Sequence, residues 1–199
     1  MAFGCSIGAC DDAHTCMCIE SRLVSDTRPI YLICLHNLPL GYIHSRSSKR
    51  RPQLDAMLPR SLALSNGHRM PSLGLGTWQQ RDPETVRRVV RQALGAGYRL
   101  IDTASAYRNE AAIGEALAAA FGDPRNGLCR ADVWITSKLS PKQQGYELAT
   151  AAVLSSLHAL QTDYVDLYLV HWPGASGQPP ESAVHRACRE ASWKALEAL

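Results

Sequence analysis

Four short apolar stretches of this 199-residue chain each end at a side chain that could take part in chemistry. In chain order these side chains are Thr77 with Trp78, then Asp102, Lys138 and His171. Tyr107 follows shortly after Asp102. A tyrosine, a lysine, a carboxylate and a histidine that lie together could transfer a proton and stabilise developing negative charge. We therefore expect acid–base chemistry if the fold brings these residues to one place.

Each of these residues also has an ordinary structural interpretation. Asp102 could cap a turn, and Lys138 could be a surface lysine with a buried stem. His171 and Tyr107 could be packing residues. One such residue alone would be interpreted in this way, but the full set at successive strand ends favours a shared site.

The elements that would position these residues alternate between short apolar stretches and amphipathic stretches. Strands are expected at about 73–78, 98–103, 132–138 and 164–171, and helices at about 82–94, 109–121, 145–160 and 187–199. The stretch 164–171 is almost continuously apolar, which is typical of a strand buried on both faces of a parallel sheet. The repeated strand–helix alternation predicts an α/β fold with parallel strands.

Local signals indicate a hairpin and a helix start. Asn66 and Gly67 lie between two short flanks and predict a β-hairpin with a two-residue turn, in which both turn residues have positive φ. Asp82 followed by Pro83 predicts a helix start, because Asp caps the first turn and Pro suits the first helical position. Gly95 is a stop signal near the expected end of that helix.

Several motifs resemble those of the aldo-keto reductases and occur in the same order. They are GLGTW at 74–78, IDTASAYRNE at 101–110, IGEAL at 113–117, ITSKL at 135–139 and LVHWP at 169–173. Residues 190–199 are similar to that family's fourth helix, so the resemblance covers about 62–199. It implies a partial (β/α)₈ TIM barrel of about the first four βα units, preceded by the hairpin. Such barrels carry their active sites at the carboxyl ends of the strands.

The resemblance implies an oxidoreductase that reduces aldehydes or ketones to alcohols with a catalytic tetrad. The tetrad is Tyr107, Lys138, Asp102 and His171. Tyr107 would be the general acid: a tyrosine hydroxyl is a weak acid at neutral pH, and the Lys138 ammonium would favour its phenolate. Asp102 would pair with Lys138 and keep it charged, while His171 would orient the carbonyl oxygen.

The hydride donor that the resemblance implies is a nicotinamide cofactor, usually NADPH (NADP), and the substrate is a small-molecule carbonyl compound. The expected cofactor-binding residues are Gly76, Thr77, Trp78 and Asp102. The expected substrate-binding residues are Trp78, Tyr107, His171 and Trp172. The two tryptophans would form apolar walls of the pocket.

The expected reductase domain, residues 61–199, departs from the family in one respect. It lacks the later strands and the Ile-Pro-Lys-Ser type motif with which the family binds the phosphates of its cofactor. We therefore expect a chain that looks truncated, has little activity alone and can self-associate through open sheet edges. The alternative is a non-catalytic half-barrel that acts only through association with a partner.

Residues 1–60 show no sustained helical or strand period and are expected to form a poorly ordered N-terminal extension. A cysteine-rich arm within it permits a zinc hypothesis that uses Cys5, Cys10, Cys16 and Cys18, with His14. Only Cys5 and Cys10 have the usual ligand spacing. We therefore predict no metal site.

Composition narrows the expected partners and location. A net charge of +3, with one short basic cluster at 46–51, argues against nucleic-acid binding. The best candidate for a membrane span, 30–43, is too short and is interrupted by polar residues. After Cys34 the chain has only Cys129 and Cys188, so a reduced, cytoplasmic protein is expected.

Overall fold

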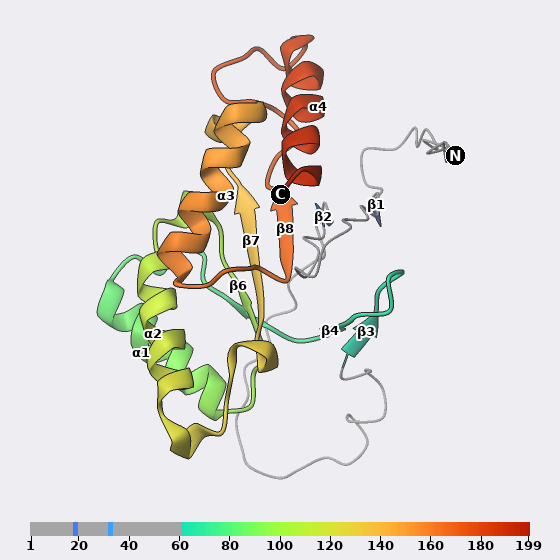
Figure 1. Ribbon diagram of the computed structural model, residues 1–199. Coiled ribbons are helices and arrows are strands. Elements are labelled where there is room, and N and C mark those ends of the chain that lie inside the picture. The colour runs from blue at the N-terminus through green and yellow to red at the C-terminus, as the bar shows by residue number, and fades with distance from the viewer. Residues whose placement is uncertain (1–17, 20–31, 34–60) are drawn as a thin grey trace, which may run out of the picture.

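The computed structural model describes residues 18–19, 32–33 and 61–199 (Figure 1). Two short strands, β1 (Cys18–Ile19) and β2 (Leu32–Ile33), pair antiparallel in a sheet of their own. The rest of the expected N-terminal extension, including most of its cysteine-rich arm, lies outside the described residues. The main body is formed by residues 61–199.

A four-stranded parallel sheet forms the centre of this body, which confirms the predicted α/β class. Its strands are β5 (Leu75–Gly76), β6 (Leu100–Asp102), β7 (Trp134–Leu139) and β8 (Leu167–Val170). They pair in chain order, β5-β6-β7-β8. The helices between and after them are α1 (Pro83–Gly95), α2 (Glu110–Gly122), α3 (Tyr146–Leu160) and α4 (Val184–Glu197).

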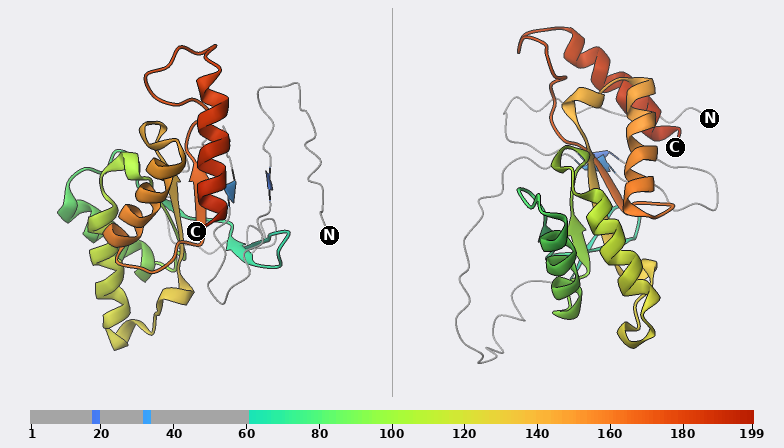
Figure 2. Two further views of the ribbon diagram at one scale, coloured as in Figure 1. Left: turned by 45° about the horizontal axis from the view of Figure 1, so that its top comes forward. Right: turned by 90° about the vertical axis from the view of Figure 1, so that its left-hand side faces the viewer.

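The helices follow the sheet in the same order as the strands. α1 packs on α2, α2 on α3 and α3 on α4. In the right-hand view of Figure 2, α1, α2 and α3 lie in front of the strands, on one face of the sheet. When every connection is a right-handed crossover and each adds the next strand at the same edge of the sheet, the helices all lie on one face. This is the arrangement of successive βα units in a barrel wall.

The core lies between this helical layer and the sheet. The strands contribute Ile101, Ile135, Leu139 and Tyr168, and the helices contribute Val86, Val90, Ile113, Leu117, Val153 and Leu160, all buried. Side chains alternate between the two faces of a strand. Because Ile101 and Leu139 face the helices, Asp102 and Lys138 lie on the opposite face, at the carboxyl ends of β6 and β7.

The predicted first helix begins where its signals place it. The Asp82 carboxylate accepts a hydrogen bond from the Thr85 N–H at 2.8 Å, and Pro83 is the first helical residue. The preceding strand is shorter than predicted: β5 has two residues, because the chain turns back after Thr77, where the Gln80 N–H bonds to the Thr77 carbonyl. None of the helices in the described residues is long and apolar enough to cross a membrane.

The predicted hairpin is present, but its turn differs from the expected one. β3 (Ser61–Ala63) pairs antiparallel with β4 (Arg69–Pro71). The Gly67 N–H bonds to the Leu64 carbonyl, and the Leu64 N–H bonds to the His68 carbonyl. φ is positive at Gly67 (86°) and not at Asn66, so the two-residue turn was wrong. The loop has three residues and closes with a glycine bulge.

Candidate active site

The ends of β6 and β7 bring a lysine and a carboxylate together. The Lys138 ammonium donates to both carboxylate oxygens of Asp102 at 2.8 Å. It also donates to the Thr103 carbonyl at 3.0 Å. The Lys138 side chain is 12% exposed and that of Asp102 36%. The ion pair is therefore partly shielded from water, and the ammonium has a fixed direction.

The third contact of this ammonium is Tyr107. The Tyr107 hydroxyl lies 3.4 Å from the Lys138 Nζ, so the ammonium lies between a carboxylate and a phenol. Tyr107 ends a single 3₁₀ turn, Ser105–Tyr107, in the loop after β6. The Ser105 hydroxyl connects that turn to β7 through the Lys138 carbonyl (3.1 Å) and to the loop after β7 through the Gln143 side chain (2.8 Å).

Aromatic rings surround the phenol. The Trp78 ring centroid lies 4.7 Å from that of Tyr107, and the His171 ring lies 5.5 Å away, edge to face. His171 follows β8, where its N–H bonds to the Leu139 carbonyl. Trp172 stacks beside His171 at 6.4 Å. Trp78 is 57% exposed and Trp172 54%, so both present apolar surface at the rim of the cluster.

The predicted cofactor-binding residues form the edge of the same cluster. Gly76 ends β5 and pairs with Asp102 in the sheet. A Cβ added at Gly76 would meet no atom within 4 Å, so the backbone there can be approached closely. Thr77 is buried, and both its N–H and its hydroxyl donate to the Asp102 carbonyl. Thr77 thus holds the end of β5 against Asp102.

Sequence analysis did not assign two residues that shape this site, Thr103 and Asn109. The Thr103 carbonyl accepts a hydrogen bond from the Lys138 ammonium, and Asn109 was expected at the start of a helix. Asn109 instead bonds to the turn that carries Trp78. Both residues lie in the motif at 101–110, but the motif does not reveal these contacts, because they join segments that come together only in the folded chain.

A buried carboxyl group lies behind the site, on the helical face of the sheet. Glu110 of α2 accepts hydrogen bonds from Ser137 of β7 (2.6 Å) and Ser156 of α3 (3.1 Å). Burial raises the pKa of Glu110, although these two hydrogen bonds oppose the rise. Burial also raises the pKa of the nearby Tyr168 hydroxyl. The Glu110 carboxyl group therefore connects α2, β7 and α3 through Ser137, the residue before Lys138, and Ser156.

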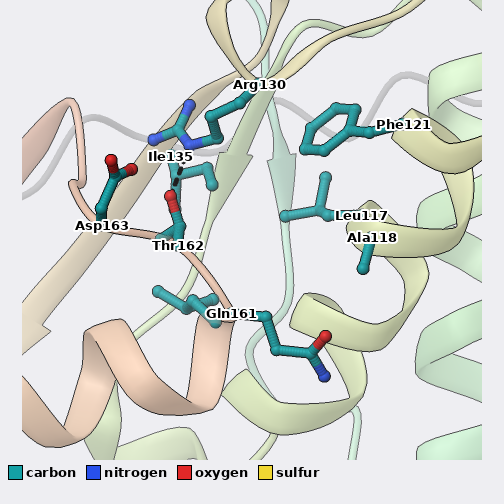
Figure 3. Close-up of a pocket in the computed structure, with 9 residues that line it drawn as sticks. Leu117, Ala118, Phe121, Arg130, Ile135, Gln161, Thr162 and Asp163 are labelled. Atoms are coloured by element: carbon teal, nitrogen blue, oxygen red, sulfur yellow. Dashed lines mark hydrogen bonds between the residues drawn. The ribbon is translucent and has the colours of Figure 1, made fainter.

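A cavity of about 460 Å³ lies at the other end of the sheet (Figure 3). Leu117 and Phe121 line its apolar side and Arg130 its polar side. The Arg130 guanidinium already donates to Thr162, the Val133 and Tyr164 carbonyls and Asp166. Four of its five N–H donors are thus used within the chain, and the cavity contains none of the residues that could transfer a proton at the Lys138 end. We therefore place the candidate site at the Lys138 end.

Comparison with known proteins identifies the family to which the chain is similar. The model of the aldo/keto reductase family matches residues 72–199. The chain is 41% identical over 138 residues to a 9,11-endoperoxide prostaglandin H2 reductase of Trypanosoma cruzi, covering 69% of this chain and 43% of that protein. It is 50% identical over 113 residues to an aldo-keto reductase of Mycolicibacterium paratuberculosis, covering 57% of this chain and 38% of that protein.

Solved structures give the same result. An aldo/keto reductase from Brucella melitensis has a TM-score of 0.59 and 39% sequence identity, covering 70% of this chain and 48% of that one. A Bombyx mori aldo-keto reductase in complex with NADP has a TM-score of 0.59 and 28% identity, covering 69% of this chain and 45% of that one. The chain thus spans less than half the length of each of these four proteins.

Proposed function

The chain belongs to the aldo/keto reductase family, and we propose that it carries the catalytic residues of an enzyme that reduces aldehydes or ketones to alcohols. The observation that carries this proposal is the position of the Lys138 ammonium between the Asp102 carboxylate and the Tyr107 hydroxyl. Such an arrangement is suited to donating a proton from a phenol.

The proton step follows from the charges. As a hydride reaches the carbonyl carbon, the C=O π bond breaks and negative charge develops on the oxygen. Tyr107 donates its hydroxyl proton to that oxygen, which completes the alcohol and leaves a phenolate. The Lys138 ammonium stabilises the phenolate, and Asp102 holds the ammonium in place. Solvent then returns the proton to Tyr107.

His171 and the two tryptophans would orient the substrate. The His171 ring lies edge to face with Tyr107, so a carbonyl oxygen that approaches the phenol would also be near the imidazole. A hydrogen bond from His171 would fix the direction of that oxygen. Trp78 and Trp172 would contact the apolar part of the carbonyl compound, since both rings are more than half exposed.

The cofactor proposed for this site is a nicotinamide dinucleotide, and NADPH is proposed because the Bombyx mori neighbour is in complex with NADP. NADPH supplies the hydride when bound. The open space beside Gly76 and the exposed Trp78 ring suit a flat group that lies close to the backbone. Asp102 would contact the cofactor through the part of its carboxylate that Lys138 leaves exposed. Thr77 would act by holding this edge in place, because its polar atoms are bonded within the chain.

The experiment follows NADPH oxidation at 340 nm with a reactive aromatic aldehyde. It uses the 199-residue chain and, beside it, a chimera in which residues 61–199 replace the matching part of the Brucella melitensis reductase. The proposal predicts aldehyde-dependent oxidation by the folded chimera, with the alcohol as product. A folded chimera that binds NADPH but forms no alcohol would contradict the proposal.

A further inference from the structure

Asn109 occupies an unusual place beside the catalytic cluster. It precedes α2, but its side chain makes no capping hydrogen bond to that helix. The residue is only 3% exposed. Its amide nitrogen donates to the Thr77 carbonyl at 2.9 Å and to the Gln80 carbonyl at 3.0 Å. Its amide oxygen accepts a hydrogen bond from the Thr103 hydroxyl at 2.9 Å.

The two carbonyls that Asn109 binds are the two ends of one tight turn. The Gln80 N–H bonds to the Thr77 carbonyl at 3.2 Å, which closes a turn over residues 77–80. Gln79 has a φ of 65° in this turn. A non-glycine residue in the left-handed region carries a cost that its surroundings must offset. The Asn109 amide supplies that support, because it bonds to both ends of the turn at once.

The turn carries Trp78, and Asn109 lies two residues after Tyr107 in the chain. One buried side chain therefore connects the loop of the proposed acid to the turn of the proposed substrate wall. We infer that Asn109 is a positioning residue that holds the Trp78 ring against Tyr107 and so sets the width of the substrate site. Only the effect of Asn109 on substrate binding rests on the proposed function. The geometry of the 77–80 turn does not depend on whether the protein is an active enzyme.

The test is fluorine NMR of the 199-residue chain labelled with 5-fluorotryptophan. The chain has four tryptophans, and Trp78→Phe assigns the Trp78 resonance. Asn109→Asp keeps the shape of the side chain but places an oxygen against the two turn carbonyls. The Trp78 resonance is expected to move toward its position in the unfolded chain. The resonances of Trp134 and Trp193, which lie outside the turn, are expected to stay where they are.

Matched variants separate positioning from general damage. Asn126→Asp makes the same chemical change in a remote loop, where the Asn126 amide donates to the Ala120 carbonyl, and should leave the Trp78 resonance unchanged. Adding Gln79→Gly to Asn109→Asp should return the resonance toward its original position, because glycine adopts positive φ without strain. If Asn109→Asp does not fold, Asn109→Ala carries the same prediction through loss of the bonds alone.

The kinetic effect is measured in the Brucella chimera. Asn109→Asp should lower kcat/KM for a bulky aromatic aldehyde by roughly 10- to 100-fold, mainly through KM, because the wall is misplaced while the acid remains. A Trp78 resonance that is unchanged in the folded Asn109 variant would overturn the inference. A chimera without reductase activity would instead count against the proposed function, and the NMR result would still decide the role of Asn109.

Discussion

The Lys138 ammonium lies 2.8 Å from both carboxylate oxygens of Asp102, so the two side chains form a bifurcated ion pair across neighbouring strands. Exposed ion pairs contribute little to stability, and the Asp102 side chain is 36% exposed. The pair matters because it orients the Lys138 ammonium. Asp102 and the Thr103 carbonyl bind two sides of the ammonium, and its remaining side faces the Tyr107 hydroxyl.

Replacing Asp102 with Asn should therefore affect the reaction more than the fold. The substitution keeps the shape of the side chain but removes the charge that holds Lys138. We expect kcat of the Brucella chimera to fall by roughly 10²-fold, at the lower end of the range for acid–base groups, with little change in the urea midpoint. Asp123→Asn, in an exposed pair with Arg125, is the control. An unchanged kcat in Asp102→Asn would contradict the role given to the pair.

Gly114 should not tolerate a methyl group. A Cβ added there would lie 2.8 Å from the Leu160 Cα and closer still to the Ala159 carbonyl oxygen, because α2 passes closely over the end of α3. Gly114→Ala should lower the free energy of unfolding by about 1–3 kcal/mol, measured by urea denaturation. Gly122→Ala in the same helix meets no atom within 4 Å and should be neutral or slightly stabilising. Equal effects of the two substitutions would argue against the close helix contact.

The buried Glu110 predicts a pH dependence of stability. Burial raises the pKa of Glu110 above its ordinary value of 4.5. The folded chain therefore binds this proton more tightly than the unfolded chain does. As pH rises from about 4.5, the unfolded state loses the proton first and is stabilised relative to the folded state. This group thus lowers the free energy of unfolding until pH passes the folded pKa, above which its effect is constant.

Glu110→Gln removes that titration while keeping a partner for both serines. Relative to the parent chain, the free energy of unfolding of the variant should increase as pH rises from 4.5 toward neutrality. Urea denaturation at a series of pH values measures this difference. Glu115→Gln, on the exposed side of α2, is the comparison in the same helix. A difference between Glu110→Gln and the parent chain that does not change with pH would exclude the predicted titration.

Arg130 should stabilise the end of the sheet that lies away from the site. Its guanidinium binds four partners, including Asp166 at 2.7 Å, and Asp166 also accepts from the Ile135 N–H. Arg130→Ala leaves a mostly buried carboxylate without its cation and should cost about 3–5 kcal/mol of unfolding free energy. Arg125→Ala removes an exposed pair with Asp123 and should change the free energy of unfolding far less. A small loss of unfolding free energy in Arg130→Ala would show that water replaces the hydrogen bonds of the guanidinium.

The alternating pattern of the strands explains why much of the fold could be predicted. Apolar stretches and helical periods located all four strands and helices of the main sheet, and the strand ends located Asp102 and Lys138. The face of each residue also follows from its neighbour: Ile101 is buried under the helices, so Asp102 must face the other way. At Asp82 the local sequence was enough to predict the helix start, because the N-cap hydrogen bond of Asp82 depends only on nearby residues.

Features that depend on tertiary contact could not be predicted. The sequence suggested a strand through Trp78, but the chain turns after Thr77, and Asn109, distant in sequence, binds both ends of that turn. The Asn66–Gly67 pair predicted a two-residue turn, yet the register of β3 and β4 places only Gly67 at positive φ. The 3₁₀ turn at Tyr107 likewise depends on contacts that Ser105 makes with β7 and with the loop after β7.

The most direct test of the account is the single-turnover rate of NADPH oxidation by the Brucella chimera with Tyr107→Phe. The substitution removes only the hydroxyl that lies 3.4 Å from the Lys138 ammonium and keeps the ring that packs on Trp78. Tyr164→Phe, at the opposite end of the sheet beside Arg130, is the matched control. We predict that Tyr107→Phe slows the reduction of a reactive aldehyde by at least about 10²-fold while Tyr164→Phe does not. Equal rates in the two variants would contradict the assignment of Tyr107 as the proton donor.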